Sequence, residues 1–121
     1  MSPLVVLAIG LIGGFGAIGR FLLDGAVSQR VRGSFPWGTL AVNLTGAFVL
    51  GALAGATLSR NAYLIAGVGL VGTYTTYSTW MLESHRLAED GRARLGVANL
   101  LGSLLAGVTA AWLGQRLGAA L

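Results

Sequence analysis

The amino-acid sequence predicts an all-α membrane protein with four transmembrane helices, and three observations support this prediction. The 121 residues are 55% hydrophobic and only 10% charged, whereas soluble domains carry about 25% charged residues. The charged residues gather in short segments, which separate four uncharged stretches of 19, 27, 22 and 21 residues. Because a helix needs about 20 apolar residues to cross a bilayer, these stretches occupy nearly the whole chain and leave no room for a soluble domain.

The first two spans are expected at about residues 4–23 and 37–58. No basic residue precedes the first stretch and apolar residues continue to Arg20, so it is not expected to be a cleavable signal. The connection at residues 25–35 is polar enough for an interfacial loop or a short surface helix. Pro36 and Trp37 then open the second span as a first-turn proline and an interfacial aromatic residue.

The remaining spans are expected at about residues 63–83 and 95–117, after a tight turn at 59–61 and a charged connection, "ESHRLAEDGRAR". Six arginines lie on the side of the first and third connections and two lie on the other side, so both termini are predicted outside the cell. The net charge of +4 comes from arginines at the membrane edges, where lipid headgroups rather than nucleic acid are the expected contact. Residues 1–121 are therefore expected to form one transmembrane domain.

The stretch "GTYTTYSTW", Gly72 to Trp80, places seven consecutive hydroxyl side chains inside the third predicted span. Threonine and serine can return their hydroxyls to the carbonyl one turn back, but seven in a row point around every face of a helix. Gly72 and the β-branched threonines also weaken a helix locally. The third helix is therefore expected to be broken near Gly72–Thr76. Irregular backbone at that depth must be buried in protein or line a wet cavity.

Polar side chains also occur at helical spacing in the second and fourth spans. The simplest role for a lone asparagine such as Asn43 is to form a hydrogen bond between two helices. However, Thr39, Asn43 and Gly46 share one helix face, and Asn99 and Ser103 repeat the four-residue spacing in the fourth span. Such a row also suits a path for something polar.

The aromatic and charged residues near the expected break favour an anion as the ligand. Tyr77 and Trp80 lie on one face after the break, and their mid-span position is less typical of interfacial aromatic residues. Amide N–H groups, hydroxyls and aromatic ring edges all present partial positive charge, and no carboxylate lies inside a span to hold a cation. Arg20 is either a snorkelling anchor or an attractive charge at the mouth of the path. The residues together predict a pathway for a small anion.

Four segments in chain order resemble the Fluc (CrcB) family of fluoride channels: "GGFGAIGRF", "GTLAVNLTGAF", "GLVGTYTTYSTW" with Glu83 following, and the small-residue fourth span with Asn99. The resemblance covers essentially the whole chain. It implies a passive, fluoride-selective channel in the bacterial inner membrane that lowers cytoplasmic fluoride. It also implies an antiparallel, dual-topology dimer with two pores along the subunit interface.

The resemblance further implies roles for individual residues. Asn43 corresponds to the pore asparagine and Arg20 to the vestibule arginine, while the backbone carbonyls of Gly72 and Thr75 from both subunits would hold a buried sodium ion. Thr39 and Ser103 would continue the polar track. With the hydroxyls of the third span, the expected fluoride pathway comprises Arg20, Thr39, Asn43, Thr76, Tyr77, Thr79, Trp80 and Ser103.

Tyr77 and Trp80 depart from the family pattern, which usually has phenylalanine at both positions. This leaves open whether the partner is a second copy or a paralogous subunit, and whether the chain conducts by itself. A small four-helix multidrug exporter is the alternative, but it needs a carboxylate in the first span, and the first acidic residue here, Asp24, follows that span. An enzyme is not expected, because the chain has no cysteine, a single histidine and no acid–base pair inside a span.

Overall fold

The computed structural model describes all 121 residues, which form helices and connections without any strand. Three helices are long and apolar enough to cross a membrane: α1 (Pro3–Arg30), α2 (Trp37–Gly55) and α6 (Ala93–Ala120). Between α2 and α6 the chain forms four shorter elements: α3 (Arg60–Tyr63), the π-helix η1 (Leu64–Val71), α4 (Gly72–Tyr74) and α5 (Ser78–Glu89). No single helix therefore runs from Tyr63 to Glu83.

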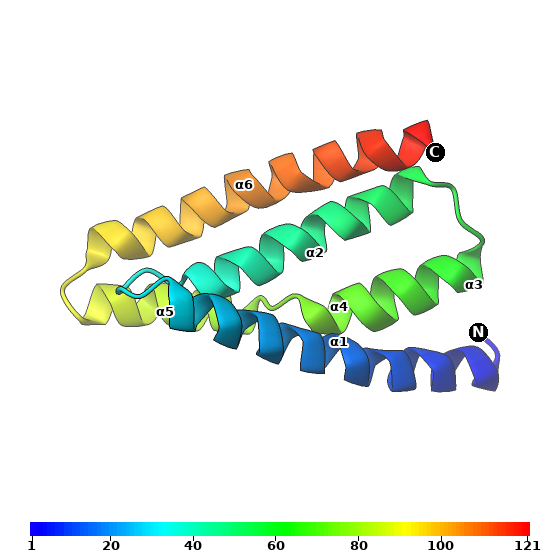
Figure 1. The fold of residues 1–121 in the computed structure, drawn as a ribbon, viewed down its shortest axis with the longest axis horizontal. Helices are drawn as coiled ribbons and strands as arrows, with labels where there is room; N and C mark the ends of the chain where they lie inside the picture. The colour runs from blue at the N-terminus through cyan, green and yellow to red at the C-terminus, as the bar shows by residue number, and fades with distance from the viewer.

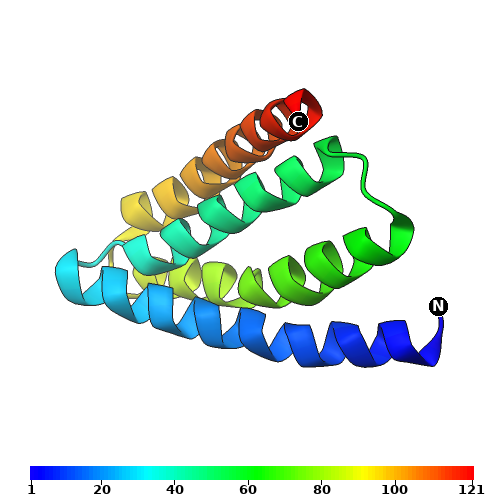
Figure 2. The same ribbon diagram turned by 45° about the vertical axis from the view of Figure 1, so that its right-hand side comes forward.

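The elements form an elongated bundle in which α2 lies between α6 and the series α3–α5 (Figure 1). α2 packs along α6, and α1 packs along η1 and α4. Both termini lie at the same end as the connection between α2 and α3, while the α1–α2 and α5–α6 connections lie at the opposite end (Figures 1 and 2). The arginine-rich connections therefore share one end of the molecule.

The first helix is longer than the span predicted from its apolar residues. α1 continues through the polar segment to Arg30, so only residues 31–36 connect it to α2. Within the extension the Ser28 hydroxyl donates to Asp24 Oδ1 over 3.2 Å, one helical turn back. Arg30 lies in the last turn, where a positive charge stabilises the helix dipole. The extension thus carries polar residues out of the predicted span without ending the helix.

Glycines allow the helices to approach closely. A Cβ atom at Gly51, Gly114 or Gly118 would collide with backbone of the facing helix, so α2 and α6 meet almost backbone to backbone. The glycines of α1 allow a similar approach to the third segment: a Cβ atom at Gly16 would collide with the backbone carbonyl of Leu70, and one at Gly13 would lie 3.1 Å from Cγ2 of Thr73. These seams hold α6 against α2, and α1 against the start of the polar segment of the third predicted span.

The single chain buries few large apolar side chains. Its buried hydrophobic residues are Val5, Val42, Val71 and Leu87. Apolar residues along α1 and α6, such as Leu7 and Leu105, are instead more than half exposed. Such continuous apolar surface requires lipid or another protein surface against it.

Candidate functional site

The helix of the third segment is interrupted at residues 75–77. Helical backbone ends at Tyr74, Thr75 is extended with φ −78° and ψ 160°, and α5 begins at Ser78. Gly72 itself is helical, so the interruption begins later than Gly72. The Thr73 hydroxyl donates to the carbonyls of Gly69 (2.8 Å) and Leu70 (3.1 Å), which holds this turn in helical form.

Asn43 of α2 binds the interrupted backbone at a single residue. Its Nδ2 donates to the Thr76 carbonyl over 2.9 Å, and its Oδ1 accepts from the Thr76 amide over 2.8 Å. Since unpaired backbone groups are costly away from water, this paired contact stabilises the non-helical backbone. We call it the Asn43–Thr76 clasp.

Two carbonyls lose their usual helical donors because of this geometry. A continuous helix would direct the amide of Thr76 to the carbonyl of Gly72 and the amide of Thr79 to that of Thr75. Instead, the Thr76 amide donates to Asn43 and the Thr79 amide donates to Oγ1 of Thr76 over 3.2 Å. The carbonyls of Gly72 and Thr75 are thus free to accept from another donor or a cation.

Some of the seven consecutive hydroxyls form hydrogen bonds within the chain and the others do not. Thr73 and Thr75 donate to carbonyls of the preceding turn, and Tyr74 shares a 2.8 Å hydrogen bond with Thr45 of α2. Thr76 caps α5 through its contact with the Thr79 amide. The hydroxyls of the remaining three residues make no hydrogen bond within the chain; these are Tyr77, Ser78 and Thr79.

The larger of two cavities beside the interruption has a volume of about 380 Å³ and lies between α2, α6 and residues 75–80. We call it the groove. It is lined by polar groups near the interruption and by small or apolar residues, such as Gly46 and Val108, farther along. The sequence-predicted residues on it are Asn43, Thr76, Tyr77, Trp80 and Ser103, together with Thr75.

A smaller cavity of about 170 Å³ lies on the other side of Thr76, which lines both spaces. Its walls include Arg20, Thr39 and Thr79, and also Asp24 and two apolar residues. The structure therefore places all eight residues of the expected pathway on two cavities that meet at Thr76. Gly72 lies on neither cavity and is exposed at the surface of the chain.

The two aromatic residues of the groove lie edge to face. The rings of Tyr77 and Trp80 have centroids 5.8 Å apart and an interplanar angle of 85°. The indole Nε1 of Trp80 donates to the Asn99 carbonyl over 3.0 Å, so this N–H is already occupied. The Tyr77 hydroxyl makes no hydrogen bond within the chain, and the residue is 71% exposed.

A buried network behind Trp80 includes residues that sequence reasoning did not assign. Asn99 is 1% exposed; its Nδ2 donates to Ser84 Oγ over 2.8 Å and its Oδ1 accepts from Ser103 over 3.1 Å. Ser84 in turn donates to the Trp80 carbonyl. The spacing of Asn99 and Ser103 signalled part of this network, but nothing local in the sequence pairs Ser84 with Asn99.

Glu83 of α5 is a second residue that sequence reasoning left without a role. The Thr39 hydroxyl donates to Glu83 Oε1 over 2.5 Å, which joins the start of α2 to α5 beside the smaller cavity. This bond occupies the hydroxyl of one predicted pathway residue. It also places a carboxylate at the outer edge of the interrupted segment.

Residues 7–115 match the family described as "CrcB-like protein, Camphor Resistance (CrcB)". A relative from Mycolicibacterium paratuberculosis is 51% identical over 113 residues, which are 93% of this chain and 93% of the relative. One from Moorella thermoacetica is 46% identical (89% of this chain and 91% of the relative), and one from Leifsonia xyli subsp. xyli is 42% identical (98% and 89%). All three relatives carry the name fluoride-specific ion channel FluC, numbered 1 or 2.

Proposed function

Since the chain belongs to the CrcB family, we propose that it is a fluoride-selective ion channel through which fluoride leaves the cell passively. It is a multi-pass protein of the bacterial cell membrane. The observation that supports the proposal best is the pair of cavities that meet at Thr76 and are lined by amide, hydroxyl and aromatic groups. Relatives of similar length named as fluoride channels support the same ion.

The groove offers donors without a competing carboxylate. One proton of Asn43 Nδ2 is used in the clasp and the other is free to face an anion. The edges of Tyr77 and Trp80 add partial positive charge to the groove, and Arg20 brings a positive charge to the smaller cavity, whose wall also holds the Asp24 carboxylate. No titratable side chain lines the groove except the Tyr77 phenol, so nothing there couples fluoride to proton transport. A membrane potential moves an internal anion outward with about 2.3 kcal/mol per 100 mV.

In this proposal residues 63–83 form the third of four membrane spans and cross in two helical parts. Non-helical backbone is tolerated at membrane depth where it is buried in protein or lines a water-filled cavity. Thr76 is buried and is held by the clasp, and the groove and the smaller cavity both border it.

The functional unit is proposed to be an antiparallel dimer, formed with a second copy or with a paralogous subunit. Tyr77 lines the groove and is nevertheless 71% exposed, so one chain does not enclose the path by itself. The exposed apolar faces of α1 and α6 offer area for such contact. In a two-fold dimer every contact is made twice, which is consistent with two pores.

A sodium ion is proposed at the two-fold axis of this dimer. The freed carbonyls of Gly72 and Thr75 fit such a site, because two subunits would supply four neutral oxygen ligands. The ion would supply a fixed positive charge between the pores. The surface position of Gly72 supports its contact with another subunit.

Fluoride efflux from loaded liposomes tests this function. The purified protein should release fluoride when only a potassium ionophore is added to balance charge, and chloride should not leave at a comparable rate. Efflux that requires an imposed pH gradient would contradict a channel and favour a coupled exporter. In a second arm, purification with a bulky organic cation in place of sodium should abolish efflux; unchanged efflux would contradict the sodium site but not the channel.

A further inference from the structure

The buried hydrogen-bond network behind Trp80 determines which groups of the groove can donate to an ion. Asn99 lies at its centre, is 1% exposed and lines neither of the cavities beside the interruption. Ser103, one turn later on α6, does line the groove. Since fluoride is only a hydrogen-bond acceptor, a hydroxyl on the wall can bind it only with its proton turned into the groove.

The orientation of the Asn99 amide follows from its partners. One amide atom lies 3.5 Å from the Trp80 carbonyl, and because a carbonyl can only accept, that atom is the nitrogen Nδ2. Ser84 has a single proton, which it donates to the same carbonyl over 2.8 Å. The Ser84 oxygen therefore accepts from Nδ2, also over 2.8 Å. The amide oxygen Oδ1 is left facing Ser103.

The proton of Ser103 is held by this amide. Oδ1 of Asn99 carries no proton, so the 3.1 Å bond between the two side chains uses the Ser103 O–H as its donor. The usual alternative for a helical serine is the carbonyl one turn back, here that of Asn99. That carbonyl already accepts from Trp80 Nε1 over 3.0 Å, in addition to its helical amide partner. Ser103 therefore presents oxygen lone pairs, and not its proton, to the groove.

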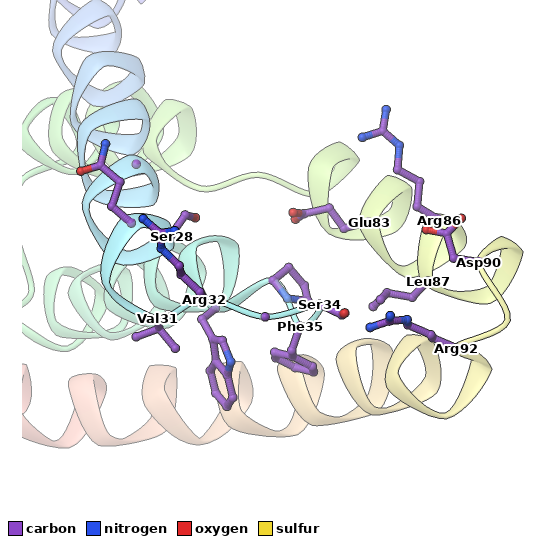
Figure 3. A pocket seen from close by; sticks show the side chains of 15 residues that line it. Ser28, Val31, Arg32, Ser34, Phe35, Glu83, Arg86, Leu87, Asp90 and Arg92 are labelled. Atoms are coloured by element: carbon purple, nitrogen blue, oxygen red, sulfur yellow. The ribbon is translucent and has the colours of Figure 1, made fainter.

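No charged side chain bonds to this network. Glu83 and Arg86 flank Ser84 on α5, but Glu83 accepts from Thr39 on the side of α2. Arg86 points away from α6 in the close view of the cavity of about 950 Å³ at the α1–α2 and α5–α6 connections (Figure 3). The directions of the hydrogen bonds are therefore set by neutral groups.

We propose that Asn99 is a positioning residue of the fluoride path, which turns the Ser103 proton away from the ion. The inference rests on the proposed function. Fluoride then accepts a hydrogen bond from Asn43 of α2, whose second amide proton is free, and none from Ser103 or the Trp80 indole on the side of α6. Ser103 can bind water through its lone pairs. A wall without free donors keeps the ion weakly held, as conduction requires.

Selective isotope labelling of asparagine tests the proposal, because the chain has only Asn43, Asn61 and Asn99. Nuclear magnetic resonance of the purified protein in detergent micelles follows the Asn43 side-chain amide during a fluoride titration and gives the Kd. Asn61→Leu and Asn99→Leu assign the three signals by elimination. Asn99→Leu should lower the fluoride Kd by about fivefold, since the released Ser103 proton can turn to the ion. In a Ser103→Ala background the same substitution should have no further effect.

Asn99→Asp is the matched control, because a carboxyl oxygen still accepts from Ser103, and this variant should not bind fluoride more tightly. Circular dichroism and gel filtration show whether each variant is folded, and Asn99→Ala repeats the test if leucine is not tolerated. If the parental protein binds fluoride but loss of the Asn99 amide does not tighten binding, or tightens it equally without Ser103, this proposal alone is overturned. A parental Asn43 amide that does not respond to fluoride would contradict the proposed function and overturn both.

Discussion

At the scale of single residues, the role of Asn43 is defined by two hydrogen bonds to one backbone unit. An asparagine in an apolar helix is expected either to join helices or to face a polar path. Here the amide joins α2 to the interrupted backbone at Thr76 and also lines the groove. The structure thus shows the first role, and in the proposed channel the same side chain would also face the fluoride path.

Replacing Asn43 by leucine should abolish fluoride efflux and destabilise the fold. The substitution removes an amide donor from the groove and leaves the amide and carbonyl of Thr76 without partners, at a cost of about 1–3 kcal/mol for each buried group. Efflux from liposomes and thermal unfolding in detergent measure the two effects. Asn61→Leu, which removes an exposed amide near the α2–α3 connection, is the control. Parental efflux in Asn43→Leu would show that the amide only joins helices.

The two aromatic residues of the groove should respond differently to phenylalanine. Trp80→Phe removes the hydrogen bond from Nε1 to the Asn99 carbonyl and should lower stability by about 1 kcal/mol. Tyr77→Phe removes a hydroxyl that has no partner in the chain and should leave stability unchanged. Both variants keep a ring edge in the groove, so both should still release fluoride from liposomes. Complete loss of efflux in Tyr77→Phe would show that the phenol, and not the ring edge, contacts the ion.

At the scale of helices, apolar stretches gave the positions of α1, α2 and α6 but not all of their ends. The clearest discrepancy is α1, which continues to Arg30 because polar side chains such as Ser28 and Asp24 satisfy each other along the helix. The π-helix η1 was not expected. In its wide turn the Gly72 amide donates to the Gly67 carbonyl, and the element packs against α1, a contact that no local sequence pattern encodes.

The polar residues of the candidate site were predictable because each is out of place in an apolar span. Their pairings were not predictable, since the partners are far apart in the chain: Asn43 and Thr76 are separated by 33 residues and Thr39 and Glu83 by 44. A sequence indicates that such groups need partners. Only the packing of α2 against the third segment determines which partners they find.

The glycine seam between α2 and α6 should tolerate no added methyl group. Gly114→Ala places a Cβ against the Phe48 backbone and should destabilise the protein by about 1–3 kcal/mol. Gly102→Ala on the same helix meets nothing within 4 Å and should stabilise it by up to about 1 kcal/mol. Thermal unfolding in detergent compares the two variants. Equal effects would mean that the seam does not depend on close backbone contact.

At the scale of the whole molecule, the distribution of apolar residues favours assembly. Only 18 of 121 residues are buried in the single chain, and the predicted path is open along the groove. Helices this exposed must face lipid or another subunit. Six arginines lie on one side of the membrane and two on the other, which favours one orientation of the chain. In an antiparallel homodimer, half of the subunits must take the opposite, disfavoured orientation.

A single introduced cysteine should reveal the orientation, because the natural chain has none. Ser34→Cys lies in the exposed α1–α2 connection at the arginine-rich end. In an antiparallel homodimer, a membrane-impermeant thiol reagent should label about half of these cysteines on right-side-out vesicles, because a two-fold axis in the membrane plane exposes each end on both sides. Ser59→Cys at the other end should give the same fraction. Labelling of one position and not the other would show a fixed orientation and would require a different subunit as partner.

The Asn43–Thr76 clasp also has a consequence for how the protein is made. Residue 43 leaves the ribosome 33 residues before residue 76, which at about 5–20 residues per second is a delay of a few seconds. During that time the amide of α2 has no backbone partner from the third segment, and the bilayer core offers none. The two segments are therefore expected to enter the lipid as a hairpin, joined by the short turn near Thr57. A pause in translation between residues 55 and 75 would leave α2 at the translocation machinery until the third segment is synthesised.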